Sequence, residues 1–308
     1  MTLTELRYIV AVAEKRHFGH AAQACFVSQP TLSVGVKRLE EELGVTLFER
    51  SPGEITLTPA GERVVEQARR ALAEANTVRD VALASRDELA GPLRLGAIYT
   101  IGPYLLPHII PAIREQAPKM PLLVEENYTV TLTDKLRRGD LDVIVIALPF
   151  EEPGLVTLPL YDEPFVMLLP ASHPLSLQPS ISTAELAQET VLLLGQGHCF
   201  RDQVLEFCPD CAPKAQQQTS LQQSLEGASL ETIRMMVTSG VGVTILPCTA
   251  AAADLYSGRL LSIRRFSDVE PGRTVALAWR SSFPRPKVIE VLRQAVAQSA
   301  LSCIERRV

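Results

Sequence analysis

Apolar residues recur at helical spacing in the first sixty residues. Leu6, Val10 and Ala13 lie four and three positions apart, which is typical of an amphipathic helix. A second, short helix is expected to follow, and a third is expected between Ser28, a good N-cap, and Gly44, a common helix terminator. The third helix carries an apolar stripe formed by Leu32, Val36, Leu39 and Leu43.

The outer face of this third helix is polar and partly basic. Two helices joined by a tight turn, with such a face on the second, describe a helix-turn-helix. Its first side chains would reach base edges in double-stranded DNA and its cations the phosphates, although spacing alone also fits a plain helical hairpin. Two short strands around Ser51-Pro52-Gly53 predict a wing, which favours the DNA interpretation. The candidate DNA-binding residues are Gln29, Pro30, Thr31, Ser33, Lys37, Arg38 and Arg50.

From Pro59 to about residue 90, apolar residues alternate steps of four and three, and Gly91-Pro92 ends the pattern. Such a seam is typical of a coiled coil, so we expect a long helix that dimerises the protein. A single helix packed on its own domain is the alternative. The seam consists of Val64, Ala68, Ala71, Ala75, Val78, Ala82, Ser85 and Leu89.

Strand and helix patterns alternate after Gly91-Pro92, which predicts an α/β domain with mostly parallel sheets. Segments 158–164 and 264–268 are expected to cross between two lobes. Thr100 and Thr129 each follow a strand, where ligands of such folds bind, although each alone is most often a helix cap. Strands are predicted at 93–98, 122–126, 142–147, 165–169, 191–194, 243–246 and 275–279, and helices at 103–116, 132–138 and 230–238.

Composition limits the function classes. The 308 residues suffice for two or three domains, and 46% of them are hydrophobic, as in globular proteins. The net charge is −5, and residues 1–60 carry six Lys and Arg against seven Glu, or −1. Any DNA binding must therefore rely on local placement of charge and gain from oligomerisation. No apolar run approaches the ~18 residues of a membrane span, so we expect a cytoplasmic protein without a membrane partner.

Cys199 is the candidate reactive thiol, because it is expected to open a helix beside His198 and Arg201, two groups that stabilise a thiolate. Asp202 opposes them or orients one of them. A buried structural cysteine is the alternative. If residues 200–207 are helical, the Cα atoms of Cys199 and Cys208 lie ~13 Å apart, whereas a disulfide requires ~7 Å or less. Joining them would unwind the helix, so oxidation would act as a structural switch.

Four further cysteines accompany this segment. Cys25, Cys248 and Cys303 have apolar or small neighbours, and we expect buried, inert thiols. Cys211 forms a Cys-X-X-Cys motif with Cys208, which we interpret as incidental, with a competing disulfide or a second partner for Cys199 as alternatives. No metal site or cofactor is expected, because no second ligand pair lies at zinc spacing.

The N-terminal region resembles the LysR-type transcriptional regulators. The similarity is carried by Phe18-Gly-His-Ala-Ala-Gln-Ala, Val27-Ser-Gln-Pro-Thr-Leu-Ser, Leu39-Glu-Glu-Glu-Leu-Gly, Leu47-Phe-Glu-Arg and Leu57-Thr-Pro-Ala-Gly. It implies a winged helix-turn-helix, a dimerising helix and a two-lobed regulatory domain like the periplasmic binding proteins, with a tetramer on promoter DNA. The expected boundaries are 1–58, 59–90 and 91–308, with lobe I at about 91–161 and 268–308 and lobe II at about 162–267.

A closer resemblance is to the hydrogen-peroxide-sensing members of this family, through Gly197-His-Cys-Phe-Arg-Asp-Gln, Cys208, Thr100, Thr129 and Ser229-Leu-Glu-Thr232. It implies that Cys199 reacts with peroxide, that Cys208 resolves the product to a disulfide, and that Thr100, Thr129 and His198 place the peroxide. Further implied are thioredoxin or glutaredoxin reductants, RNA polymerase as a partner and activation of antioxidant-defence genes. A regulator that binds a small metabolite is the runner-up. A thiol peroxidase or reductase is a third possibility, which the DNA-binding motif disfavours, so no enzyme is expected.

Overall fold

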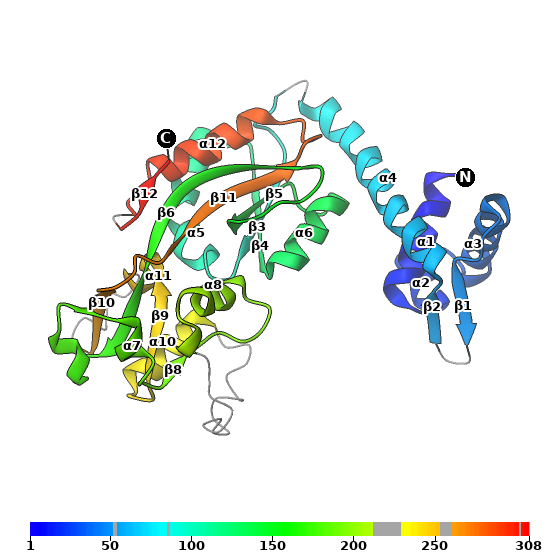
Figure 1. The fold of residues 1–308 in the computed structure, drawn as a ribbon. Helices are drawn as coiled ribbons and strands as arrows, with labels where there is room; N and C mark the ends of the chain where they lie inside the picture. Colours follow the sequence, from blue (N-terminus) through cyan, green and yellow to red (C-terminus); the bar gives the residue numbers. More distant parts are fainter. Residues whose placement is uncertain (52–53, 85–86, 212–228, 253–259, 302, 308) are drawn as a thin grey trace. The chain divides into compact units, whose positions relative to one another are not determined.

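The computed structural model describes residues 1–51, 54–84, 87–211, 229–252, 260–301 and 303–307. The chain divides into two compact units (Figure 1). One unit is essentially Met1–Arg86, and the other holds nearly all of Asp87–Val308. We describe each unit by itself. No helix among the described residues is both long enough and apolar enough to cross a membrane.

The N-terminal unit contains three packed helices, a hairpin and a long helix, as the apolar spacing predicts. Its core is formed by fully buried apolar side chains of the helices, among them Ile9, Leu32, Val36 and Leu39. Leu47 closes this core from the segment before the hairpin. The elements are α1 (Leu3–Lys15), α2 (Phe18–Ala24), α3 (Gln29–Leu43), β1 (Phe48–Ser51), β2 (Glu54–Leu57) and α4 (Pro59–Ala84).

The long helix α4 is shorter than its seam predicts. It ends at Ala84, and Leu89 instead lies in a turn and packs against the core of the second unit. Ser85 lies outside the described residues. Ala68 is buried against the N-terminal core, but Val78 and Val81 are 68% and 50% exposed. An apolar face is therefore left open on the second half of α4.

Lobe I of the second unit is built on strands in the order β4, β3, β5, β11, β6. The strand β3 pairs in parallel with β4 and β5, whereas β11 is antiparallel to β5 and β6. Helices α5 and α12 pack against each other beside this sheet. The elements are β3 (Leu93–Ile98), α5 (Gly102–Gln116), β4 (Leu122–Asn127), α6 (Thr129–Arg138), β5 (Val143–Ala147), β6 (Leu155–Pro170), β11 (Gly272–Arg280), α12 (Pro286–Ala297) and β12 (Glu305–Arg306).

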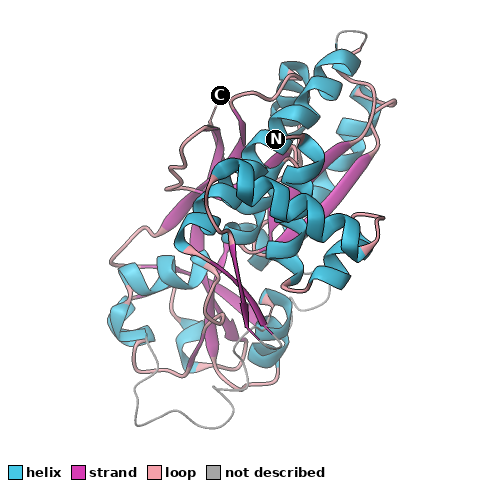
Figure 2. Cartoon of the chain, turned by 90° about the vertical axis from the view of Figure 1, so that its right-hand side faces the viewer, coloured by secondary structure: helices cyan, strands magenta, loops and turns pink. Residues whose placement is uncertain are grey.

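Lobe II is built on the second half of β6, which pairs with β9 and β10. Figure 2 shows the chain with its strands in magenta and its helices in cyan. A separate core fills it, with Phe165, Met167 and Leu169 of β6 at its centre. The elements are η1 (Pro174–Leu177), β7 (Ser180–Ile181), α7 (Thr183–Leu186), β8 (Val191–Leu192), α8 (Cys199–Phe207), η2 (Pro209–Cys211), α10 (Leu230–Thr238), β9 (Val243–Pro247), α11 (Cys248–Ala252) and β10 (Leu261–Phe266).

The structure corrects three predictions for this unit. The sheets are mixed rather than mostly parallel, because β6 and β11 run in opposite directions between the lobes and pair with each other. The strand expected at 165–169 is the second half of β6, so the first crossing is a continuous strand. The second crossing, expected at 264–268, lies at 267–271. Helix α12 was missed, although Val288, Leu292 and Ala295 mark its buried face.

Candidate functional site

The first turn of α3 presents the polar residues that the sequence singles out. The side chain of Ser28 caps the helix by accepting a hydrogen bond from the Thr31 amide at 3.3 Å, and Pro30 occupies the first turn. Gln29, Pro30, Thr31 and Lys37 are exposed, and Ser33 is half-buried. Because the opposite face of α3 is fully buried, this exposed face is held in one orientation.

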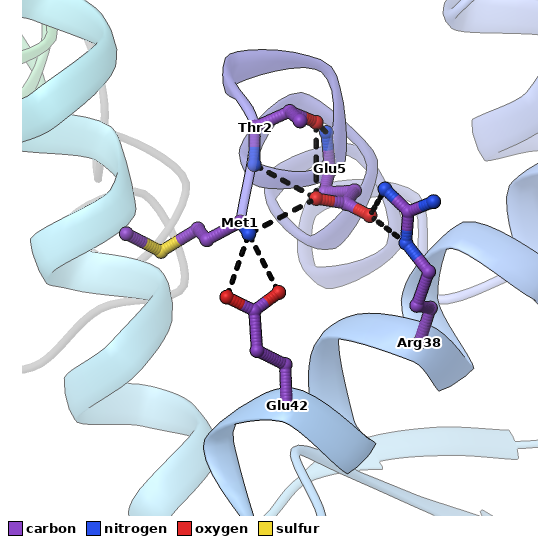
Figure 3. Close-up of polar contacts among 5 residues, drawn as sticks. All are labelled: Met1, Thr2, Glu5, Arg38 and Glu42. Atoms are coloured by element: carbon purple, nitrogen blue, oxygen red, sulfur yellow. Dashed lines mark hydrogen bonds and ion pairs between the residues drawn. The ribbon is translucent and has the colours of Figure 1, made fainter.

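Arg38 has a role that the sequence did not reveal, because its guanidinium forms an ion pair with the buried carboxylate of Glu5 on α1 (Figure 3). The Nε of Arg38 donates to Glu5 at 2.6 Å. Thr2 also donates to Glu5, completing a capping box, while Glu42 of α3 binds the N-terminal amine of Met1 at 2.6 and 2.7 Å. These contacts fix α3 to α1.

The electrostatics of Glu5 follow from this arrangement. Burial raises the pKa of its carboxyl group, but the hydrogen bonds from Thr2 and Arg38 outweigh that effect and hold the pKa below its usual 4.5. Glu5 is therefore an anion at neutral pH. It pairs with Arg38, whose side chain as a whole is 64% exposed.

The wing is tied to α3 by a second carboxylate. Glu40 accepts hydrogen bonds from the backbone amides of Leu47 at 2.7 Å and Phe48 at 3.3 Å. In the hairpin, Arg50 pairs with Ile55 across the two strands, as expected for a wing. The side chain of Arg50 lies outside the described part of the chain, so its expected phosphate contact remains a prediction.

In the second unit, Cys199 is the first residue of α8 and lies where the two lobes meet. The helix belongs to lobe II, whose core receives Phe200 and Val204. Cys199 itself is half-buried against the core of lobe I, and its Sγ accepts a hydrogen bond from Thr129, the first residue of α6, at 3.7 Å. Thr129 was predicted to lie near a ligand, and the structure places its hydroxyl beside the candidate reactive thiol.

His198 lies next to this thiol inside an aromatic cluster. Its ring centroid is 4.8 Å from that of Tyr128 and 6.0 Å from that of Tyr99, and the residue is only 7% exposed. Burial lowers the pKa of His198 below 6.5, so the imidazole is neutral at pH 7. A neutral imidazole remains available as a hydrogen-bonding group, and the expected help of His198 in stabilising a thiolate stays a prediction.

Arg201 has a hydrogen-bond partner that the sequence did not reveal, and its expected effect on the thiol stays a prediction. Its guanidinium donates to the carbonyl oxygen of Leu194 at 2.8 Å and so secures the loop that precedes α8. Asp202 is exposed in the first turn of the helix. The two charged residues that follow Cys199 in the sequence thus differ in role, and Arg201 supports the local backbone.

Thr100 takes part in a buried ion-pair network, and its expected role in placing peroxide stays a prediction. Its hydroxyl and its carbonyl oxygen each accept a hydrogen bond from Arg273 at 2.8 Å. Arg273 pairs with Glu163 at 2.7 Å, and both side chains are completely buried. Thr249 of α11 donates to the same carboxylate at 2.6 Å, and the Arg273 guanidinium lies 5.6 Å from the ring centroid of Phe200. Sequence reasoning missed this network, because nothing local marks Glu163 and Arg273 as partners.

Cys208 and Cys211 are joined in the structure by a disulfide, with their Cα atoms 5.4 Å apart. Both are buried in the core of lobe II, Cys208 as the C-cap of α8 and Cys211 in the turn η2. The interpretation of Cys211 as incidental is therefore wrong, because the turn brings it to its neighbour. Helix α8 spans Cys199–Phe207 as predicted, so Cys199 and Cys208 stand at opposite ends of it.

The remaining cysteines are of two kinds. Cys25 is half-buried and free, and burial raises the pKa of its thiol, as befits an inert residue. Cys248 and Cys303 are joined by a second disulfide with a Cα separation of 6.1 Å. The prediction that these two are buried, inert thiols is wrong, because the structure joins them although they are 55 positions apart in the sequence.

Comparisons with known proteins agree with this architecture. Residues 3–62 match the family of bacterial regulatory helix-turn-helix proteins of the LysR type, and residues 86–301 match the LysR substrate-binding domain. The chain belongs to the LysR family of transcriptional regulators. Its mixed α/β fold and its two modules are those of that family.

Similar proteins within the family carry names that refer to OxyR or to hydrogen peroxide. The DNA-binding transcriptional dual regulator OxyR of Escherichia coli is 38% identical over 296 residues, covering 96% of this chain and 95% of that protein. A probable hydrogen peroxide-inducible genes activator of Streptomyces viridosporus is 41% identical, covering 97% and 94%. The solved structure of a full-length OxyR variant from Pseudomonas aeruginosa is 52% identical, with a TM-score of 0.79 and coverage of 100% and 98%.

Proposed function

We propose that this chain is a cytoplasmic, hydrogen-peroxide-responsive regulator of transcription in which Cys199 is the sensing thiol. One observation carries the proposal. Cys199 opens α8 at the meeting point of the two lobes, half-buried, with the Thr129 hydroxyl 3.7 Å from its sulfur and the buried His198 beside it. A small, uncharged oxidant suits such a site, because the hydrogen-bond donor at the sulfur, Thr129, is neutral.

The chemistry proceeds in two steps. The Cys199 thiolate attacks one oxygen of hydrogen peroxide, the O–O bond breaks, and hydroxide leaves with a proton as water, giving a sulfenic acid. The Cys208 thiol then attacks that sulfur and expels a second water, forming the Cys199–Cys208 disulfide. Thr129 donates to the sulfur or to an incoming oxygen, and His198 accepts or donates a hydrogen bond as a neutral imidazole. Thr100 acts indirectly, by holding the guanidinium of Arg273 in place.

The second step needs Cys208 as a free thiol, and its bond to Cys211 is a competing state. A thioredoxin- or glutaredoxin-type dithiol would return the protein to its reduced form by exchange. Unwinding of α8 is required, since ~13 Å separates the ends of a nine-residue interval in a helix. Loss of α8 packing at both lobes is the structural signal.

The output is binding to promoter DNA through α3 and the wing. Gln29, Thr31 and Ser33 would face base edges, while Lys37 and Arg50 would contact phosphates. Arg38 would contribute from its anchored position on Glu5. The exposed Val78 and Val81 of α4 support dimerisation along that helix, with tetramers, RNA polymerase contact and activation of antioxidant-defence genes as further parts of the proposal.

A metabolite-binding regulator is less well supported. A cavity of about 1030 Å³ is lined by residues at and beside the lobe crossings, such as Pro149, Asp162 and Glu270. Neither Cys199 nor Thr129 lines it. A metabolite bound there would leave Cys199 and Cys208 without a role.

Peptide mapping after stoichiometric peroxide tests the proposal. Trypsin places Cys199 in residues 139–201 and both Cys208 and Cys211 in residues 202–214, so the Cys199–Cys208 bond links two peptides while the Cys208–Cys211 bond stays within one. The reduced wild type should yield the linked pair. Cys199→Ser should bind promoter DNA with unchanged affinity and show no change of footprint on peroxide, with Cys25→Ser as the matched control. A Cys199→Ser protein that still switches would overturn the assignment.

Cys208→Ser and Cys211→Ser separate the two candidate resolving thiols. We expect Cys208→Ser to retain a sulfenic acid at Cys199, which a dimedone-type reagent would trap. Cys211→Ser should form the Cys199–Cys208 bond faster than the wild type, because the competing bond is gone. A full response in Cys208→Ser would transfer the resolving role to Cys211.

A further inference from the structure

Cys248 and Cys303 form a second thiol pair away from α8. Cys248 is the first residue of α11 in lobe II, and it is 5% exposed in the core of that lobe. Cys303 lies in the segment between α12 and β12 and is half-buried. The Sγ of Cys248 is 3.0 Å from the carbonyl oxygen of Cys303, and the Cα separation of 6.1 Å is within the range of disulfides.

The segment that carries Cys303 is held in place independently of any sulfur bond. Glu305 and Arg306 of β12 pair with Asp162 and Tyr161 of β6. The Arg307 guanidinium donates to Asp162 at 2.6 Å, and Arg306 donates to the carbonyl oxygen of Ser299. The two sulfurs are thus brought together by the fold itself, and oxidation needs no unwinding of a helix.

A cavity of about 640 Å³ opens beside this pair and is lined by both cysteines. Arg264 and Arg265 of β10 line it as well, and none of its described lining residues is acidic. Arg264 is engaged with the carbonyl oxygens of Gln178 and Ser176, whereas Arg265 is exposed. This cavity therefore approaches Cys303, the more accessible thiol, from a side that carries two arginines, whereas the acidic residues near Cys303 line the neighbouring cavity of about 1030 Å³.

We propose that Cys248 and Cys303 are a second redox-active pair, oxidised by exchange with a small anionic disulfide that docks in this cavity. The Cys303 thiolate attacks one sulfur of that disulfide, whose S–S bond breaks and releases one thiolate, leaving a mixed disulfide on Cys303. The Cys248 thiolate then attacks the Cys303 sulfur and expels the second thiolate. Two protein thiols are oxidised, and one small disulfide is reduced to two thiols.

The product ties the C-terminal segment of lobe I to α11 of lobe II, beside the β6 crossing. The protein would thereby respond to the state of the small-thiol pool through a site that does not involve Cys199. This inference is independent of peroxide sensing, because neither its oxidant nor its residues are those of α8.

The test uses the full-length reduced protein in buffers of graded glutathione and glutathione disulfide, quenched with acid and alkylated. Trypsin leaves Cys248 in residues 235–259 and Cys303 in residues 294–306, with one cysteine in each peptide. We expect these peptides to be linked as the disulfide fraction rises. In Cys248→Ser, glutathione should accumulate on Cys303, whereas in Cys303→Ser the buried Cys248 should remain unmodified.

Arg265→Gln tests the docking step without touching either sulfur. Linkage by glutathione disulfide should slow by about threefold, in line with the loss of one partly screened charge attraction. Linkage by the uncharged disulfide of mercaptoethanol should keep its rate, which also serves as the folding control. Equal slowing by both reagents would overturn the docking proposal. Free thiols at 248 and 303 in buffers that already oxidise Cys208 and Cys211 would overturn the redox pair itself.

Discussion

Helices α3 and α8 both carry functional residues at their N-termini, but they are attached to their domains in different ways. The side chain of Ser28 caps α3, three of its residues are buried, and Arg38, Glu40 and Glu42 bind α1, the wing and the chain terminus. In contrast, α8 has no side-chain cap from His198, and only Phe200 and Val204 are buried within it. Helix α3 is thus anchored by several polar contacts, whereas α8 is held mainly by packing.

The polar contacts of α8 point the same way. Gln203 donates to the carbonyl oxygen of Leu148 at 3.3 Å, but its own Oε1 is buried without a hydrogen-bond partner among the described residues. A buried, unpartnered acceptor lowers the stability of the helical state. An element that must unwind to report oxidation should have such a small stability margin.

The largest expected effect comes from removing the ring that anchors α8. Phe200 is 3% exposed and packs edge-on against Phe165 at a centroid distance of 5.0 Å. Phe200→Ala should lower the unfolding free energy by about 3–5 kcal/mol and speed formation of the Cys199–Cys208 bond. Chemical denaturation and timed alkylation measure the two quantities. Phe207→Ala, at a less buried position, is the control, and slower bond formation in Phe200→Ala would break the comparison.

Loss of the Glu5 anchor should have a smaller effect, confined to the DNA-binding unit. Glu5→Gln should reduce stability by about 1–2 kcal/mol, since the buried partner of a charged hydrogen bond is weakened, and should leave peroxide oxidation of Cys199 unchanged. Circular dichroism during denaturation and peptide mapping give both readouts. Arg69→Gln, on the same unit, is a control for loss of one charge.

The same carboxylate predicts a pH dependence. Because the folded pKa of Glu5 lies below its unfolded value, its contribution is fully present above pH 4.5 and is lost as the pH falls through the folded pKa. Wild-type stability should fall more steeply below pH 4.5 than that of Glu5→Gln. Parallel curves for the two proteins would contradict this.

Removal of the α3 cap is expected to have a slightly smaller effect. Ser28→Ala should destabilise the helix by about 1 kcal/mol and weaken DNA binding, because the first turn that faces the groove would fray. Electrophoretic mobility shift and thermal unfolding measure the effects. Ser229→Ala removes a corresponding cap on α10 and should leave DNA affinity unchanged.

The smallest effect is expected from protonation of His198. Its folded pKa is depressed, so its contribution to stability is complete above the unfolded value of about 6.5 and declines as the pH falls toward the folded pKa. The wild type should lose stability from pH 6.5 downward relative to His198→Gln. A wild type that gains stability over that interval would show that the imidazole is charged in the fold.

The features that could be predicted from sequence are those encoded by local spacing. The helix-turn-helix follows from apolar periodicity with Ser28 and Gly44 at the ends of its second helix. The wing follows from the turn at Ser51-Pro52-Gly53, and α8 from its place after a predicted strand. Contacts between distant residues could not be predicted in this way, since Glu163 and Arg273 or Cys248 and Cys303 have no local signature of pairing. The burial of His198 could not be predicted for the same reason, because Tyr99 and Tyr128, whose rings pack around it, follow β3 and β4 far away in the sequence.

Strand β6 is continuous over 16 residues through both lobes, and β11 pairs with it from Leu155 to Pro164. At ~3.3 Å per residue, a strand of this length extends over ~50 Å, and its pairing with β11 shifts register once, between Val275 and Ala276. Two lobes that share such a continuous strand resist hinge closure around a ligand. Oxidation of Cys199 would therefore be transmitted as a local change of structure within an otherwise rigid domain. Such a mechanism suits hydrogen peroxide, which offers too little surface to draw the two lobes together.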